Sequence, residues 1–207
     1  MSDSINLPPE FRGRSYEAFL FDMDGTMLDS SAVTERVWRA WALRHGIDVE
    51  EVLSTIHGVR AIDTVRRFAP PETDIDSEAK SILEAELNDV DGIVPVGGIN
   101  AFLDRLDPNH WAIVTSAPRA LAEVRLRAVH LPVPSVMITA EDVRQGKPAP
   151  EGFLRAAQRL GVLITNCLVF EDSPAGVAAA KAAGAEVAIV GNLVPSRSGN
   201  HAIADYL

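Results

Sequence analysis

Two aspartates that follow the first apolar segment of the chain are the first candidates for chemistry. Asp22 and Asp24 come directly after the run Tyr16–Phe21, and Gly25 follows them. Two carboxylates so close together repel each other, so a counter-ion is expected beside them. In an open α/β sheet, ligands bind at the carboxyl ends of the strands, where this pair would lie. Because Asp-Gly is also a common turn dipeptide, a simple turn is the alternative interpretation.

A hydroxyl pair and a lysine are the next candidates. Thr115 and Ser116 follow the apolar run Trp111–Val114 and precede Pro118, which can open a helix. Free N–H groups and the positive dipole end make a helix N-terminus a ready anion site, although simple N-capping would use the same residues. Lys147 lies in the turn-like sequence Gln-Gly-Lys-Pro, where a lone lysine is most simply solvated.

An acidic pair follows a third apolar run. Glu171 and Asp172 come after Cys167–Phe170 and before Ser173, so helix capping alone would also explain them. Taken together, however, three strand ends would deliver two aspartates, a hydroxyl pair and an acidic pair to one rim, with Lys147 beside them. Carboxylates hold Mg²⁺, and hydroxyls and lysine hold phosphate oxygens, so this set suits a phosphoryl group bound with Mg²⁺.

The elements that must position these residues are short apolar runs separated by helical stretches. Such runs are typical of strands that are buried on both faces of a parallel sheet. Helix signals between them are Ser173-Pro174 at a start and Gly184 at an end, with Pro118, Pro150 and Gly161 as further boundaries. The alternation predicts an open α/β sheet. The expected strands are Tyr16–Phe21, Trp111–Val114, Val136–Ile138, Cys167–Phe170 and Val187–Val190.

Residues 31–94 differ, because they contain no convincing strand. Apolar residues at helical spacing predict three helices there, the first ended by Gly46, the second by Pro70-Pro71, and the third capped by Asp76. The expected inward residues are Val33, Val37, Ala40 and Trp41, then Ile62, Val65 and Phe68, then Ile82, Leu83, Leu87 and Val90. A small all-helical insert after the first strand is therefore expected.

Composition limits the function. The chain has 207 residues, of which 47% are hydrophobic and 23% charged, with a net charge of −10. This acidic balance argues against nucleic acid and anionic membranes as partners. The sole cysteine, Cys167, lies in an apolar run and is expected in the core. One thiol, with no apolar stretch long enough for a membrane span, fits a cytoplasmic protein.

The four motifs, in this order, resemble the signature of the haloacid dehalogenase superfamily. They are Asp22-x-Asp24-Gly25-Thr26, Thr115-Ser116, Lys147-Pro148 and Glu171-Asp172-Ser173-Pro174-Ala175-Gly176-Val177. The resemblance covers about residues 15–195. It implies a Rossmann-like, doubly wound parallel sheet formed by residues 15–30 and 95–207, with residues 31–94 as an inserted helical cap. The second aspartate implies a phosphoryl-transfer member, because dehalogenases of the superfamily lack it.

The resemblance also implies a role for each motif residue. Asp22 would be the nucleophile that becomes an aspartyl-phosphate, and Asp24 would be the general acid and then the general base. Asp22, the backbone carbonyl of Asp24 and Asp172 would hold Mg²⁺, with Glu171 as a further candidate. The residues expected to bind the phosphoryl group are Thr115, Ser116 and Lys147.

Residues of the insert resemble the cap of glycerol-phosphate and hexitol- or sugar-phosphate phosphatases. They are Ile56-His57-Gly58, Arg60 and Phe68-Ala69-Pro70. His57 and Arg60 are therefore candidates for substrate contacts, although His57 at a helix end is equally well explained as a solvent-facing residue. The implied function is Mg²⁺-dependent hydrolysis of small polyol or sugar monophosphates by a monomer or weak homo-oligomer, whose partner is a small phosphorylated metabolite.

Two alternatives remain open. A sugar phosphomutase similar to β-phosphoglucomutase would share every core motif, but relatives of that enzyme carry a histidine where this sequence has Thr34. A catalytically idle phosphosugar-binding relative could have lost the nucleophile or the acid, yet Asp22 and Asp24 are both present.

Overall fold

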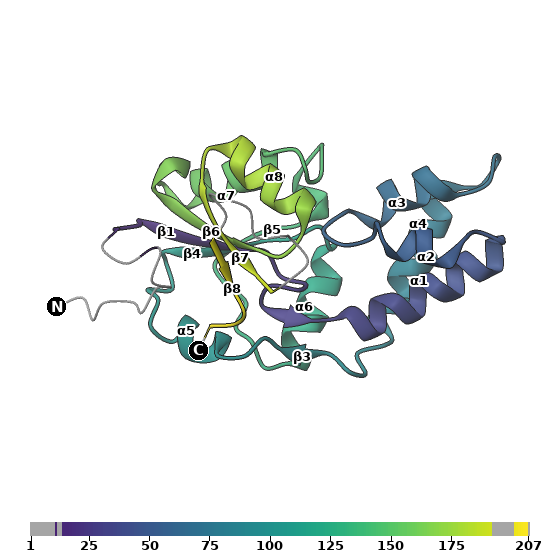
Figure 1. The fold of residues 1–207 in the computed structure, drawn as a ribbon, viewed down its shortest axis with the longest axis horizontal. Helices are drawn as coiled ribbons and strands as arrows, with labels where there is room; N and C mark the ends of the chain where they lie inside the picture. Colours follow the sequence, from purple (N-terminus) through teal and green to yellow (C-terminus); the bar gives the residue numbers. More distant parts are fainter. Residues whose placement is uncertain (1–10, 12–13, 192–200, 207) are drawn as a thin grey trace.

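A computed structural model describes residues 11, 14–191 and 201–206. Its centre is a six-stranded sheet in the order β5-β4-β1-β6-β7-β8, in which every neighbouring pair is parallel (Figure 1). The strands are β1 (Ala18–Phe21), β4 (Trp111–Val114), β5 (Val136–Ile138), β6 (Cys167–Glu171), β7 (Glu186–Val190) and β8 (His201–Ile203).

Helices cover both faces of this sheet, which confirms the predicted doubly wound α/β class. In Figure 1, α7 (Glu151–Leu160) and α8 (Pro174–Ala183) lie above the sheet, and α5 (Ile99–Leu103) and α6 (Arg119–Ala128) lie below it. Two short 3-10 helices, η2 (Ala140–Asp142) and η3 (Ile164–Asn166), complete the connections. The strands β1, β4, β6 and β7 are therefore buried on both sides, which is why they appear in the sequence as continuous apolar runs.

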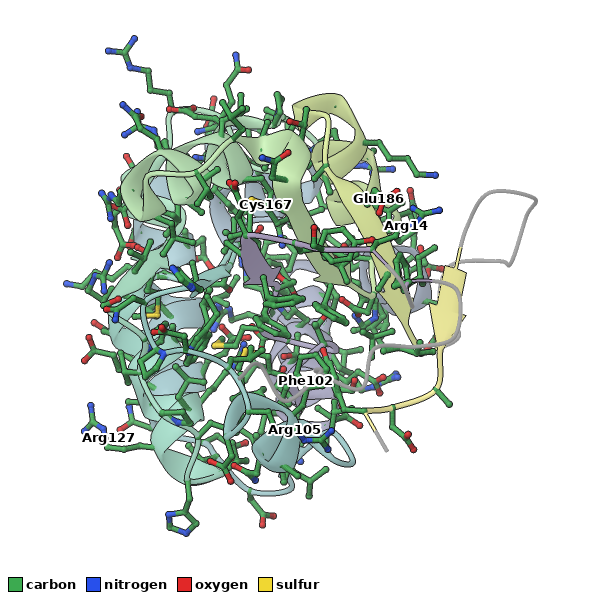
Figure 2. The ribbon with its side chains drawn as sticks, turned by 90° about the vertical axis from the view of Figure 1, so that its left-hand side faces the viewer. Arg14, Phe102, Arg105, Arg127, Cys167 and Glu186 are labelled. Carbon is green, nitrogen blue, oxygen red and sulfur yellow. The ribbon has the colours of Figure 1, made fainter. Side chains whose placement is uncertain are left out.

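Strand β1 lies in the middle of the sheet, and its side chains alternate between two apolar clusters. Phe19 and Phe21 face the cluster between the sheet and helices α5 and α6, where Phe21 stacks on Phe170 at 4.8 Å between ring centroids. Phe102 of α5, labelled in Figure 2, packs edge-on against both phenylalanines of β1 according to the ring angles of 87° and 79°. Ala18 and Leu20 face the opposite cluster under α7 and α8.

The opposite cluster also contains Cys167, as expected from the sequence. Its side chain is fully buried in β6, and Figure 2 shows it inside the molecule. Burial raises the pKa of its thiol to about 11, so at neutral pH it stays protonated and behaves as a small apolar residue.

The predicted helix boundaries of the core are confirmed. The side chain of Ser173 caps α8 by accepting from the Gly176 N–H at 3.0 Å, and Pro174 occupies the first helical position. Gly184 and Gly161 end α8 and α7 in left-handed conformations. The start of α8 directly follows β6, so the residues between them are fixed at the carboxyl end of that strand.

Four helices stand between residues 30 and 90 of the chain, after β1 and before α5, and project to one side of the sheet (Figure 1). They are α1 (Ser31–His45), α2 (Val49–Leu53), α3 (Ala61–Phe68) and α4 (Ile75–Leu87), and we call them the helical insert. A separate apolar cluster holds them together, with Trp38 and Trp41 in edge-to-face contact at 5.4 Å. Two short antiparallel strands, β2 (Leu28–Asp29) and β3 (Val94–Pro95), carry the chain into and out of the insert.

Several details expected for the insert are wrong. Asp74, not Asp76, caps α4 by accepting from the Ser77 N–H, so the helix begins at Ile75, two residues earlier than a cap at Asp76 would place it. Ala40 is exposed, because the buried face of α1 is formed by Val33, Trp38, Trp41 and Ala42. Val90 is exposed as well, because it lies beyond the end of α4. Val94, within the range expected to lack strands, pairs with Asp29.

Residues 192–200 and 207, which the sequence assigned to the core, lie outside the described residues. Among the helices that are described, we find none with the length and apolar character needed to cross a bilayer.

The stacked ring of Phe21 gives a stability test. Replacing Phe21 by Ala removes a fully buried aromatic side chain and should lower the free energy of unfolding by about 3–5 kcal/mol. Leu43, whose surface is 67% exposed on α1, is the matched control, and Leu43→Ala should change stability little. Chemical denaturation of both variants makes the comparison. Equal losses would show that the cluster around Phe21 does not support the sheet.

Candidate active site

A buried lysine joins two strand ends at the carboxyl edge of the sheet. The Lys147 ammonium donates to Asp22 and, at 2.6 Å, to Glu171 Oε1. The parallel register between β1 and β6 pairs Phe21 with Phe170, so the residues that follow them, Asp22 and Glu171, are neighbours. No more than 5% of any of the three side chains is exposed. The sequence therefore brings one cation and two anions into contact away from water.

The first turn of α8 holds Glu171 in place. Its second oxygen, Oε2, accepts from the Ser173 N–H at 2.9 Å and from the Ser173 hydroxyl at 3.0 Å. A Cβ at position 176 would lie only 1.6 Å from Glu171 Oε1, so only glycine leaves room for this carboxylate. Both oxygens of Glu171 are therefore engaged, Oε1 by Lys147 and Oε2 by Ser173.

A third carboxylate, that of Asp172, lies close to Asp22 and Glu171. Ligand atoms of Asp22, Glu171 and Asp172 all lie within 4.8 Å of one another, which is close enough to hold one metal ion. The Thr26 hydroxyl donates to Asp172 Oδ1 at 3.3 Å. Gly25 has φ of +85°, and a Cβ there would lie 2.0 Å from Asp172 Oδ2, so the glycine lets the backbone after β1 approach this carboxylate.

The electrostatics of this group are unbalanced. Three neighbouring carboxylates share one ammonium, which contacts two of them, so with all three ionised two formal negative charges are uncompensated in a buried site. Burial raises the pKa of Asp22 well above its ordinary value, although Lys147 opposes the shift. Burial and then the charge of Glu171 raise the pKa of Asp172 to about 7. Burial alone would lower the pKa of Lys147, but Asp22 and Glu171 raise it, so the lysine stays charged. A divalent cation would restore the balance.

The carboxylate of Asp24 points away from this group. Its Oδ1 accepts from the Ser30 hydroxyl at 2.7 Å and from Arg125 Nη1 at 2.8 Å. Arg125 also contacts Glu86 Oε1 of α4 at 3.2 Å, so the chain of contacts runs from the sheet edge into the helical insert. In the described residues, the acidic cluster able to hold a metal ion includes no Asp24 carboxylate oxygen.

The hydroxyl pair after β4 lies at the same edge. Thr115 is buried, and its Oγ1 accepts from the Ala117 N–H at 3.0 Å. The Ser116 hydroxyl donates to the Gly58 carbonyl of the insert at 2.8 Å. Gly58 packs so closely that a Cβ there would lie 2.2 Å from the Ser173 hydroxyl. The loop between α2 and α3 therefore rests directly on the edge that carries the candidate residues.

A cavity of about 410 Å³ lies between this edge and the insert. The polar lining residues from the core are Asp22, Asp24, Thr115, Ser116, Arg125 and Asp172. The polar lining residues from the insert and the loop that enters it include Asp29, Ser30, Ser31, Thr34, Glu35, His57 and Glu86. Trp38 adds an aromatic surface. The cavity is large enough for a small polar ligand. Its lining extends from the acidic cluster to residues of α1 and α4.

The two candidate residues of the insert differ in position. His57 lines the large cavity. Arg60 is instead bound to Asp63, with Nε at 2.7 Å from Oδ2, and its stem packs against Gly146 in the loop that carries Lys147. It lines a smaller pocket with Thr115, Ser116 and Lys147. In this structure Arg60 therefore lies nearer to the lysine loop than to the large cavity.

Most of the residues singled out from the sequence thus lie together: Asp22, Asp24, Thr115, Ser116, Lys147, Glu171 and Asp172 meet at one edge. Sequence reasoning missed Arg125 and Glu86. Both occupy apolar stripes, Arg125 one turn after Leu121 on α6 and Glu86 one turn after Ile82 on α4. Opposite charges on two apolar helix faces were the available signal, because such residues are rarely buried unless paired.

Comparison with known proteins agrees with the fold and the motifs. A family model described as haloacid dehalogenase-like hydrolase matches residues 16–184. Hexitol phosphatase A of Escherichia coli (strain K12) is 43% identical over 178 residues, which cover 84% of this chain and 82% of that protein. Glycerol-1-phosphate phosphohydrolase 2 of Saccharomyces cerevisiae is 36% identical over 186 residues, with 82% and 72% covered. The chain belongs to the family of haloacid dehalogenase-like hydrolases, and within it is a phosphatase.

Solved structures show the same fold. The β-phosphoglucomutase of Clostridium difficile superposes with a TM-score of 0.80 over 92% of each chain, at 23% identity. CbbY of Rhodobacter sphaeroides, solved with phosphate, gives a TM-score of 0.76 at 21% identity over 92% of this chain and 95% of that one. At these identities the similarity concerns the architecture alone.

The ion pairs of Lys147 give a second stability test. Lys147→Met would leave Asp22 and Glu171 buried without a cation, which should lower the free energy of unfolding by about 3–5 kcal/mol. The loss should be larger near pH 8 than near pH 5, because Asp22 has a raised pKa in the folded state and escapes the penalty when it is protonated.

Lys80→Met is the matched control, because the side chain of Lys80 is 75% exposed on α4. It should leave the unfolding curve nearly unchanged at both pH values. If Lys147→Met were equally harmless, the lysine would not be the buried counter-ion described above.

Proposed function

We propose that this phosphatase hydrolyses small polyol or sugar monophosphates through a phosphorylated Asp22. The substrate class is suggested by the names of its relatives, hexitol phosphatase A and glycerol-1-phosphate phosphohydrolase 2. The observation that carries the mechanism is that Asp22 lines the cavity and is held by Lys147, while Asp24 is held separately by Ser30 and Arg125. Two carboxylates in different surroundings can take different roles.

In the proposed reaction an Asp22 oxygen attacks phosphorus while the bond from phosphorus to the leaving oxygen breaks. The carboxyl of Asp24 gives its proton to that leaving oxygen. In the second step Asp24 takes a proton from water, the water oxygen attacks phosphorus, and the bond to Asp22 breaks to release inorganic phosphate. Thr115, Ser116 and Lys147 would bind the phosphoryl oxygens, since an ammonium and N–H or O–H donors stabilise the charge of the transferring group.

Mg²⁺ is the proposed cofactor. It would be held by Asp22, Asp172 and the backbone carbonyl of Asp24, with Glu171 as a further candidate ligand. The cluster of acidic oxygens around Asp22 fits a hard cation. When bound, the ion would neutralise the excess negative charge of the site and of the phosphoryl group. Without such a charge the buried carboxylates would repel an anionic substrate.

The helical insert, within the proposed unit 31–94, would act as the cap over a core made of residues 15–30 and 95–207. Its contact through Gly58 and Ser116 lies at the edge of the cavity and would help to exclude water. Hydroxyl and carboxylate groups of Ser31, Thr34 and Glu35 would face the hydroxyl groups of a polyol or sugar. His57 would contact the substrate from the cavity wall, and Arg60 would do so after leaving Asp63.

The phosphomutase alternative is less well supported. Thr34 stands where relatives of β-phosphoglucomutase carry a histidine, and its Oγ1 accepts a hydrogen bond from Arg125 at 3.3 Å. The alternative of a catalytically idle phosphosugar-binding relative is also disfavoured, because Asp22 and Asp24 are both present and both line the cavity. The cytoplasmic location, the small phosphorylated metabolite as partner and the monomer or weak homo-oligomer stay predictions.

The nucleophile assignment has a direct test. Asp22→Asn should abolish phosphate release from p-nitrophenyl phosphate, because an amide cannot form the aspartyl-phosphate. Circular dichroism should show that the variant remains folded. Asp107→Asn, an exposed aspartate before β4, is the control and should keep the activity. Turnover by Asp22→Asn at the wild-type rate would remove Asp22 from the mechanism.

The cofactor has a test that does not depend on turnover. Adding Mg²⁺ to the metal-free protein should raise its melting temperature, because a ligand that binds only the folded state stabilises it. The rise should disappear in Asp172→Asn, and EDTA should silence the wild-type enzyme until Mg²⁺ is restored. Metal-independent activity, or an unchanged shift in Asp172→Asn, would contradict the proposed site.

A further inference from the structure

Arg125 is a charged residue in an apolar place. It lies on the face of α6 that packs under the sheet, with Leu121, Ala122 and Leu126 as its buried neighbours on that helix. Only 5% of its side chain is exposed. Three acceptors surround it: Asp24 Oδ1 at 2.8 Å, Glu86 Oε1 at 3.2 Å and Thr34 Oγ1 at 3.3 Å.

These acceptors belong to different parts of the molecule. Asp24 follows β1 at the sheet edge, whereas Thr34 and Glu86 come from α1 and α4 of the helical insert. The side chain of Glu86 is 7% exposed, so the pair between Arg125 and Glu86 is shielded from water. Arg125 is therefore a buried ionic connection between the candidate acid–base residue and the insert.

Stability alone does not account for this arrangement. Taking an ion pair out of water costs about as much as the attraction returns, and apolar residues of similar volume commonly serve as well. The fit is also incomplete, because the Nε atom of Arg125 is buried without a partner among the described residues. A costly buried charge that touches the proposed acid of the reaction suggests a role in the reaction.

The contact fixes one orientation of the Asp24 carboxyl group. Both donors, the Ser30 hydroxyl and Arg125 Nη1, bind the same oxygen, Oδ1. In the described part of the chain no group donates to Oδ2, and Asp24 lines the cavity. The two bonds thus stop rotation of the carboxyl group and leave Oδ2 free for a proton and a substrate.

We propose that Arg125 is a positioning residue that holds Asp24 for proton transfer to the leaving group, and that Glu86 of the insert holds Arg125 in turn. The inference rests on the proposed function, in which Asp24 is the general acid. It adds that the acid is oriented from α6 and α4, outside the four sequence motifs.

The consequence depends on the leaving group. When the bond between phosphorus and the leaving oxygen breaks, a phenoxide or alkoxide needs the proton of Asp24, whereas p-nitrophenolate is stable as an anion and leaves without it. The quantity kcat/KM covers only the steps up to this bond breakage when transfer to Asp22 is irreversible. A misplaced acid should therefore lower kcat/KM for phenyl phosphate and spare kcat/KM for p-nitrophenyl phosphate.

The experiment measures kcat/KM for these two aryl esters, with sorbitol 6-phosphate as an alkyl ester, in wild type and Arg125→Met. We expect kcat/KM to fall about 10- to 100-fold for phenyl phosphate and sorbitol 6-phosphate, and by less than about threefold for p-nitrophenyl phosphate. Glu86→Gln should show the same selective loss to a smaller extent, because its amide still accepts from Arg125 but without charge.

Two further variants keep the test decisive. Arg125→Met leaves Glu86 buried and unpaired, so if it fails to fold, Arg125→Met/Glu86→Met removes both charges and should show the same selective loss in a folded protein. Arg127→Met is the matched control, because Arg127 lies on the same helix with its side chain 74% exposed and pointing outward at the surface (Figure 2). Arg127→Met should leave the activity toward all three esters unchanged.

Equal losses for the two aryl esters, or no loss in the folded double variant, would overturn the role of Arg125 while the proposed function stands. Selective loss in Arg125→Met with an unchanged Glu86→Gln would overturn the role of Glu86. A wild-type protein that releases no phosphate from any of the three esters would instead defeat the proposed function and this inference with it.

Discussion

The rest of the site depends on one constraint: several almost fully buried carboxylates meet at the edge of a parallel sheet and must be neutralised there. Lys147 supplies one positive charge between Asp22 and Glu171. The register of β1 against β6 brings the two acids together, and Gly176 leaves the space that Glu171 occupies. The fold therefore brings the negative charges together, and Lys147 neutralises only part of them. A bound cation would neutralise the rest, as the proposed phosphoryl-transfer site requires.

A second ionic group separates the work of the two aspartates. Asp22 is surrounded by Lys147 and other acids, whereas Asp24 is bound to Ser30 and Arg125. Neighbouring carboxylates with different partners can serve as nucleophile and as acid in one reaction. Because Arg125 also binds Glu86, the surroundings of Asp24 include the helical insert. Under the proposed function, the insert would therefore take part in the chemistry as well as cover the cavity.

Much of this architecture was available in the sequence. The apolar runs gave the central strands, and the Ser173-Pro174 start and Gly184 end of α8 gave its limits, because these features depend on local periodicity and capping. Motif residues at strand ends were expected to meet, since parallel strands bring their carboxyl ends to one edge. The α/β class follows from these features, whereas the family and the phosphatase class follow from the resemblance of the four motifs to the haloacid dehalogenase superfamily. The comparisons confirm the family and the phosphatase class.

What the sequence did not reveal depends on tertiary contacts. Helix α4 begins after Asp74 because that side chain caps it, whereas Asp76 was the cap expected from the sequence. Two aspartates this close together in the sequence are equally suitable caps, so only the folded structure distinguishes them. Arg125 and Glu86 find each other across the boundary between the sheet and the insert, and no local pattern specifies which helices meet there. The different placement of His57 and Arg60 likewise depends on where the insert rests on the core.

The central claim is that Asp22 itself becomes phosphorylated, and acid quenching during turnover tests it most directly. Enzyme mixed with radiolabelled p-nitrophenyl phosphate would be stopped in acid, digested, and its labelled peptides identified by mass spectrometry. The account predicts label on the peptide that contains Asp22 and no label in Asp22→Asn. Phosphate release from an enzyme that never carries label, or label on another residue, would contradict it.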